Sequence, residues 1–223
     1  MYYTDPVDEW NSIHKDDLWV YNKLFLSHSL GYLCGPVGTS VPSPDHYIVR
    51  PSINLLGMGR FSRIEWIYKY TDHFHPSEFW CQRFYGNHIS VDFRDKKAEL
   101  VVLGERDDDN LLYKWEKWTK IEKEVQFPEV LNNLKGNYEW INCEFIGNKL
   151  IEVHFRRNPD FRYGNSVAIP VWKGEEVEKI DSFIFVDDQD YLRKGFYIDT
   201  RDSNPVKSSD FNESGANNDQ KSR

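Results

Sequence analysis

The sequence has few cysteines and no long apolar run, and each absence excludes a class of protein. Only 3 of its 223 residues are cysteine, namely Cys34, Cys81 and Cys143. An odd number without regular spacing predicts neither a disulfide framework nor a zinc site. No segment approaches the roughly 18 consecutive apolar residues of a membrane span, and the acidic N-terminus lacks the apolar core of a signal peptide. We therefore expect a cytoplasmic protein with three buried, reduced thiols and no membrane partner.

An excess of positive charge is also missing. The formal net charge is -8, from 28 Lys and Arg residues against 36 Asp and Glu residues. A general nucleic-acid binder normally carries a basic face, so nucleic acid is not an expected partner. Residues 111–124, LLYKWEKWTKIEKE, interleave aromatic residues with lysines. A platform for nucleic-acid bases is one interpretation of this segment, and an amphipathic segment with inward-facing aromatic rings is the one that an acidic chain favours.

Aromatic residues are abundant and supply the material for a core. They make up 16% of the chain, while the hydrophobic fraction is a modest 39%. Large aromatic side chains bury much surface each, and a disordered chain would have few of them. The length is sufficient for one compact domain or two small lobes. Residues 200–223 are polar and nearly free of apolar residues, which predicts a disordered tail.

Along the chain, hydrophobic periodicity predicts few helices and many strands, the pattern of an α+β protein. Apolar residues at helical spacing predict one helix over 15–30, capped by Asp16 or Asp17 and ended by Gly31. Residues 34–44 are rich in Gly and Pro and predict a loop. A short helix is expected over 128–134. Strands are expected over 46–53, 63–70, 79–84, 88–94, 98–106, 138–146, 149–155, 166–172 and 182–186, with a last aromatic run near 196–197.

Two extended runs around a Gly-Asn turn, within residues 136–161, carry a group of candidate metal ligands. Glu152 and His154 are two apart on the second run and so project from one face of the strand. The first run carries Asn142 and Glu144 among apolar residues. Hairpins with oxygen and nitrogen ligands on one face are a common means of holding Mg²⁺ and a polyphosphate. Taken alone, the Glu152–His154 pair is explained more simply as an exposed strand face.

A second candidate is the pair Gly57 and Gly59, between two predicted strands. Two glycines separated by one residue let backbone N–H groups approach an anion closely. The pattern by itself is more often a plain hairpin turn. His73 and His75 form an H-x-H pair without a nearby acidic or cysteine partner, which favours solvated surface over a metal site.

Three segments, which follow one another in the order found in that family, resemble the ATP-grasp superfamily of carboxylate–amine ligases, over roughly residues 46–160. The first, YIVRPSINLLGMGRFSRI, is similar to the family's strand with a phosphate-contacting basic residue and to the glycine-rich hairpin that follows it. Arg stands where the family usually has Lys, and Arg also binds phosphate oxygens well. The resemblance assigns the phosphates to Arg50, Gly57, Met58 and Gly59.

The second segment, FWCQRFYGNHISVDF, is similar to the family's hinge. There the hinge backbone pairs with the adenine edge, and a later acidic side chain binds the ribose hydroxyls. Here Gln82 stands at the usual acidic hinge position and His88 at the ribose-contacting position. The resemblance therefore implies a nucleotide site formed by Gln82, Arg83, Phe84 and His88.

The third segment, KLIEVHFRRNPDF, is similar to the family's closing signature. Glu152 matches the glutamate that bridges the magnesium ions, and His154 stands where Asn is usual. The position of the family's other acidic ligand falls at Asn142 or at Glu144. Glu144 is preferred because a carboxylate is the better Mg²⁺ ligand. Arg156 or Arg157 would contact phosphate or acyl phosphate as the catalytic arginine.

The resemblance implies an α+β, ATP-grasp-like fold in which two small lobes with antiparallel sheets enclose a nucleotide cleft. Residues 46–80 would form the smaller lobe, 81–199 the larger lobe, and 1–45 an N-terminal helix and loop left from a preceding domain. The implied activity is an ATP- and Mg²⁺-dependent ligase that joins a small carboxylate to an amine, or to a thiol, through an acyl phosphate.

Two alternatives remain open at this point. One is an ATP-grasp-like domain that binds a nucleotide or a protein without catalysis, and the other is an unrelated α+β structural protein. Geometry discriminates between them, because the ATP interpretation requires Arg50, residues 57–59, Glu144 and Glu152 to face one cleft.

Overall fold

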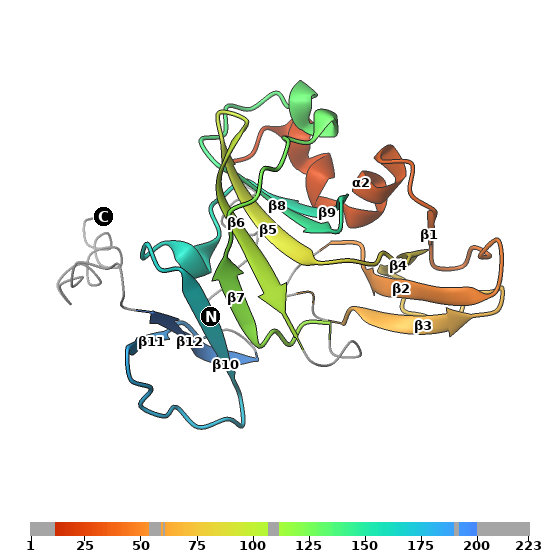
Figure 1. The fold of residues 1–223 in the computed structure, drawn as a ribbon. Coiled ribbons are helices and arrows are strands. Elements are labelled where there is room, and N and C mark those ends of the chain that lie inside the picture. Colours follow the sequence, from red (N-terminus) through yellow and green to blue (C-terminus); the bar gives the residue numbers. More distant parts are fainter. Residues whose placement is uncertain (1–11, 54–58, 60, 107–111, 190–191, 200–223) are drawn as a thin grey trace, which may run out of the picture.

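The protein is built from two antiparallel sheets that lie side by side (Figure 1). This computed structural model describes residues 12–53, 59, 61–106, 112–189 and 192–199. The smaller sheet has the order β1-β4-β2-β3, from β1 (Cys34–Pro36), β2 (Asp45–Pro51), β3 (Arg63–Ile67) and β4 (Glu78–Gln82). The larger sheet has eight strands in the order β11-β12-β10-β7-β6-β5-β8-β9. These are β5 (His88–Arg94), β6 (Lys97–Glu105), β7 (Lys117–Lys120), β8 (Ile141–Ile146), β9 (Lys149–His154), β10 (Val167–Trp172), β11 (Phe183–Asp187) and β12 (Arg193–Asp199).

Helical structure is short and mostly of the 3-10 type. The expectation of one helix over 15–30 is wrong, because the segment consists of η1 (Lys15–Tyr21) and α2 (Lys23–Ser29). Asn22 lies between them in an extended conformation, caps α2 by accepting a hydrogen bond from the Phe25 N–H at 3.0 Å, and forms a backbone bridge with Ile53. The cap of η1 is His14 rather than an aspartate. The other helical turns are η2 (Glu129–Asn133) and η3 (Pro159–Phe161).

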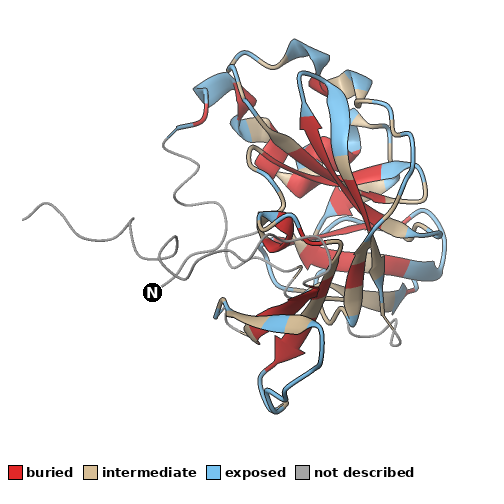
Figure 2. Cartoon of the chain, turned by 60° about the vertical axis from the view of Figure 1, so that its left-hand side comes forward, coloured by how far each residue is buried: buried red, intermediate tan, exposed pale blue. Residues whose placement is uncertain are grey.

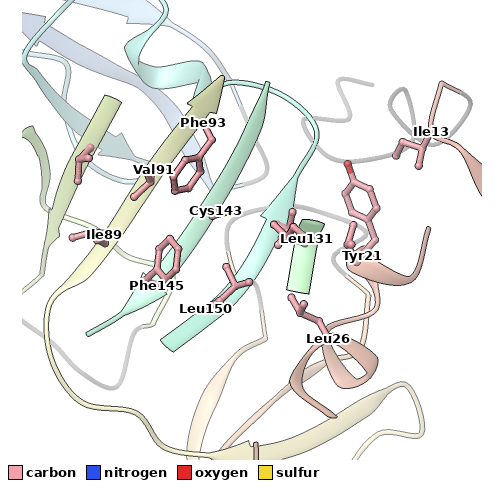
Figure 3. Close-up of a cluster of buried hydrophobic side chains, with 13 residues drawn as sticks. Ile13, Tyr21, Leu26, Ile89, Val91, Phe93, Leu131, Cys143, Phe145 and Leu150 are labelled. Atoms are coloured by element: carbon pink, nitrogen blue, oxygen red, sulfur yellow. The ribbon is translucent and has the colours of Figure 1, made fainter. Parts of the chain in front are cut away.

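One face of the large sheet packs against the N-terminal helices and forms the main core. Alternate residues of β5 and β8, among them Val91 and Cys143, point toward this side, as do Tyr21 from η1 and Leu26 from α2 (Figure 3). Burial runs along the inner strands of the sheet, as Figure 2 shows in red. The intervening residues of the same strands project from the opposite face, and that face is free to form a site.

The sequence predictions for the strands hold for most elements, with differences at their ends, but β1 lies in the predicted loop 34–44 and β7 was not predicted as a strand. The strand over 88–94 has the predicted bounds, and Gly147 with Asn148 makes the predicted turn between β8 and β9. The strand expected over 63–70 ends at Ile67, and the one expected over 79–84 ends at Gln82. Cys34 is only half-buried, against the expectation of three buried thiols. No helix in the described part of the chain is long and apolar enough to cross a membrane.

Candidate functional site

A cavity of about 470 Å³ lies between the two sheets. One side is formed by β2 and β3 of the small sheet, through Ile48, Arg50 and Ile64. The other side is the face of the large sheet that does not carry the helices. It contributes residues from β9 at one edge to β12 near the other. A cavity of this size with converging polar groups is the usual form of a small-molecule site.

Arg50 on β2 connects the two sheets beside the cavity. It is only 8% exposed, stacks over the Phe79 ring at 5.3 Å, and donates from Nη2 to the Ile151 carbonyl of β9 at 3.1 Å. Among the described residues, no group accepts a hydrogen bond from its buried Nε. Arg50 also lines the cavity, and its positive charge is suited to an anionic ligand there.

Two glutamates form the acidic part of the cavity. Glu144 on β8 and Glu152 on β9 are direct cross-strand partners, which places their side chains next to each other on one face. Glu144 is the more accessible, with 28% of its side chain exposed, and its Oε2 lies 3.0 Å from Nε2 of His88. His88 in turn packs edge-on against Trp115.

Glu152 is the more enclosed of the pair, and basic side chains surround it. Its Oε2 lies 2.8 Å from Nζ of Lys23, and its Oε1 lies 3.3 Å from Nε2 of His154. Burial alone would raise the pKa of the Glu152 carboxyl, but Lys23, His154 and Arg50 together hold the pKa well below its usual range. Glu152 is therefore an anion whose charge is already compensated within the protein.

Asn142 belongs to a third, hydrogen-bonded part of the site. Its Nδ2 donates to Ser90 Oγ and to Asp92 Oδ1, both at 2.8 Å. Asp92 also accepts from the backbone N–H of Asn158 at 2.9 Å. Burial raises the pKa of Asp92, and these hydrogen bonds oppose the effect. The network fixes Asn142 and the loop after β9 at the edge of the cavity.

Aromatic rings cover the sheet beside the glutamates. Trp115 and Trp118 lie 4.5 Å apart between ring centroids, and both line the cavity. Gly104 on β6 makes room for them, because a Cβ there would lie 2.7 Å from Trp115 and 2.8 Å from Trp118. Arg106 stacks over the Trp115 ring at 4.9 Å. Flat rings beside a cation are suited to a planar, conjugated ligand group.

Arginines gather at the cavity although the chain as a whole is acidic. Arg193 is buried at the far end, where it donates to both oxygens of Asp160 at 3.0 and 2.8 Å and to Asp188 at 3.2 Å. Such a concentration of guanidinium groups attracts anions such as phosphate and carboxylate. The arginines that line the cavity are Arg50, Arg83, Arg106, Arg156, Arg162 and Arg193.

The structure brings most of the predicted site residues to this one cavity. Gln82 is not among its lining residues, because its side chain is turned to the Leu33 N–H at 2.7 Å. Arg157 does not line it either and stacks over Trp140 at 4.4 Å. Gly57 and Met58 lie outside the described residues. The predicted residues that line the cavity are Arg50, Gly59, Arg83, Phe84, His88, Asn142, Glu144, Glu152, His154 and Arg156.

Several residues in or beside the cavity were not predicted from the sequence. In the 111–124 segment, Trp118 is buried as the amphipathic interpretation expects, while Trp115 is only partly buried. Nothing in the pattern indicated that Trp115 and Trp118 face a cavity. Arg193 was missed because a single arginine within an aromatic strand carries no motif. Lys23 was missed because its helix lies far from Glu152 in the sequence.

The residues fit a magnesium ion only in part. In the described ranges, no three His, Cys, Asp or Glu side chains are grouped as a metal site would require. Mg²⁺ bound to a phosphorylated ligand needs only one or two carboxylates, however. Glu144 meets this need as a partly exposed carboxylate on the cavity. Glu152 does not, because both of its oxygens already face Lys23 and His154.

No protein-family model and no curated protein matches the sequence. Among solved structures, the chain is similar to a candidate ATP-grasp superfamily protein from Archaeoglobus fulgidus, with a TM-score of 0.50 and 14% identity. The match covers 81% of this chain but 64% of the other, so the chain spans less than two thirds of that protein. The ATP-grasp ligase PsnB, in complex with a minimal precursor, matches at a TM-score of 0.39 and 12% identity, over 70% of this chain and 55% of that one. The second match is too weak to support an inference.

Proposed function

Starting from an ATP-grasp-like α+β fold, we propose that the chain is an ATP-dependent ligase that joins a carboxylate to an amine. One observation carries the proposal. One cavity is lined by Arg50 on β2, by Gly59 between β2 and β3, and by Glu144 and Glu152 on the large sheet. The ATP interpretation requires these residues to face one cleft together with Gly57 and Met58, which lie outside the described residues. An unrelated α+β protein would have no reason to bring the four described residues together.

The phosphates of ATP would lie beside Arg50, a cation that lines the cavity. Arg156, at the cavity on the loop after β9, would stabilise the charge that develops on the transferred phosphoryl group. Glu144 would hold a magnesium ion that accompanies the triphosphate and neutralises part of its charge. The base would find stacking surface on Trp115 and hydrogen-bonding backbone at Arg83 and Phe84.

The reaction needs no nucleophile from the protein. A substrate carboxylate oxygen attacks the γ-phosphorus, the bond to ADP breaks, and an acyl phosphate forms. The amine then attacks the carbonyl carbon, phosphate leaves, and the nitrogen gives up its proton. Arg162 and Arg193 line the cavity where a carboxylate would need a cationic partner. The chain's own part is to bind, to align and to stabilise charge.

A second candidate function is nucleotide binding without catalysis. The observation that favours it is the contact between Lys23 and Glu152, which occupies the carboxylate that the family uses for metal. The two candidates share the nucleotide site and differ only in turnover.

Thermal unfolding with and without ATP and Mg²⁺ tests the shared site. At one hundred times the dissociation constant, a ligand stabilises the fold by about 2.7 kcal/mol, which raises the Tm of a chain this long by roughly 5–10 °C. Arg50→Gln should abolish most of this shift. The matched control is Arg94→Gln, because Arg94 is half-exposed and lies outside the cavity lining. An equal shift in both variants would contradict the proposal. Release of phosphate in the presence of small carboxylates and amines then separates ligase from binder.

A further inference from the structure

Lys23 supplies a cation to Glu152 from outside the segments that resemble the ATP-grasp family. It is the first residue of α2 and is 4% exposed. Its Nζ lies 2.8 Å from Glu152 Oε2, and only 5% of its side chain and 10% of that of Glu152 are accessible. Glu152 lines the cavity and Lys23 does not, so the ammonium group meets the carboxylate from within the protein.

The backbone around Lys23 holds the ammonium group in place. The Lys23 N–H donates to the Ser52 carbonyl at 2.8 Å, just after β2. The preceding Asn22 bridges to Ile53 and caps α2. α2 also packs against β9, which carries Glu152. Lys23 is thus fixed at a junction of α2, β2 and β9, and this is not the arrangement of a solvated surface lysine.

This placement has a direct electrostatic consequence for metal binding. A divalent ion at Glu152 would have to displace an ammonium group that is buried with it, and would then lie near the guanidinium of Arg50 as well. Without the lysine charge, Glu144 and Glu152 would be two adjacent cross-strand carboxylates that keep His88 and His154 as ion-pair partners at 3.0 and 3.3 Å. Two neighbouring carboxylates repel each other and attract a cation.

We infer that Lys23 is a built-in counter-ion that replaces a metal ion at Glu152, so that the site uses at most one divalent cation, held at Glu144. Lys23 acts through Glu152 and is a positioning residue. Only the role of the Glu144 cation, as the ion that accompanies ATP, rests on the proposed function. The preference of Glu152 for lysine over metal concerns the protein alone and is testable without nucleotide.

The test is Mn²⁺ binding to the full chain without nucleotide, measured by the loss of the free-ion signal in electron paramagnetic resonance. Lys23→Met should gain a site that binds Mn²⁺ roughly ten- to a hundredfold more tightly than the wild type does. Adding Glu144→Gln to Lys23→Met should remove the gained site. Lys23→Arg, which keeps the cation, should bind as weakly as the wild type.

Equal Mn²⁺ affinity in the wild type and in Lys23→Met would overturn the inference. Lys23→Gln serves if the methionine variant does not fold, because its amide can still donate to Glu152 while the charge is lost, and the same gain is expected. The assay contains no ATP, so a failure of ATP to bind would sink the proposed function and leave this result standing.

Discussion

Replacing Asp17 with asparagine should destabilise the protein strongly, although Asp17 lies outside the cavity. Its buried carboxylate receives hydrogen bonds from the segment that leads into β8. The Lys135 N–H reaches both oxygens at 2.9 Å, while the Gly136 N–H at 2.7 Å and the Tyr138 hydroxyl at 2.8 Å reach Oδ2. An asparagine keeps one acceptor oxygen, but its NH₂ group would face groups that are themselves hydrogen-bond donors and could not accept from it.

The magnitude follows from the number of bonds affected. A hydrogen bond to a charged group contributes about 1.5–3 kcal/mol, and the losses at one carboxylate are not additive, so we expect about 3 kcal/mol in total. For a chain of this length, that lowers the Tm by roughly 6–12 °C. Urea denaturation monitored by tryptophan fluorescence measures the free energy of unfolding directly. Asp16→Asn is the control, because the Asp16 side chain is 57% exposed.

The difference should also depend on pH. Burial alone would raise the pKa of Asp17, but the hydrogen bonds from Gly136, Lys135 and Tyr138 outweigh it and lower the pKa. A carboxyl group whose pKa is lower when folded stabilises the protein above its unfolded pKa, about 3.9, and loses this contribution as the pH falls through the folded value. The wild type and Asp17→Asn should therefore converge in stability below about pH 4. A difference that is absent at pH 7, or that grows toward acid, would refute the reasoning.

Three further substitutions test the fold and the cavity. Gly195→Ala should prevent stable folding, because its Cβ would collide with the Val186 carbonyl oxygen, and circular dichroism would reveal the loss. Glu78→Gln should cost about 1 kcal/mol in urea denaturation, because Glu78 accepts two hydrogen bonds from the partly exposed Arg63, and normal stability would contradict this. Trp115→Ala should weaken ATP binding by about 1–3 kcal/mol through lost stacking, measured by calorimetry; unchanged affinity would place the base elsewhere.

Much of the fold was predictable because the alternation of apolar and polar residues in a strand is a property of neighbouring residues in the sequence. In β5, Ile89, Val91 and Phe93 alternate with polar residues, and the strand begins and ends where the pattern predicts. The N-terminal helix was not predicted correctly, because Asn22 fits a helical window by composition. Asn22 instead forms a backbone bridge with Ile53, a distant residue that a local pattern does not include.

The candidate site was predictable as far as side chains on neighbouring strands define it. Glu144 and Glu152 belong to one hairpin, but the two-residue turn alone would pair Glu144 with Ile151. The register shift between Glu144 and Phe145 makes the two glutamates cross-strand partners, and spacing does not predict it. The partners that decide their chemistry come from distant parts of the chain. Lys23 reaches Glu152 only because α2 docks on β9, and no local pattern records that contact.

The hydrogen bonds of the N-terminal segment also set an order of events during synthesis. Lys135 follows Asp17 by 118 positions, and Phe155, whose N–H binds the Tyr21 hydroxyl, follows Tyr21 by 134. At about 5–20 residues per second, a ribosome needs roughly 6–27 s to make the partners that this segment requires. During that interval Val20 and Leu26, both about 1% exposed in the folded protein, have no sheet to cover them. η1 and α2 can therefore dock only after β8 and β9 have been made, and their apolar side chains stay without these partners until then.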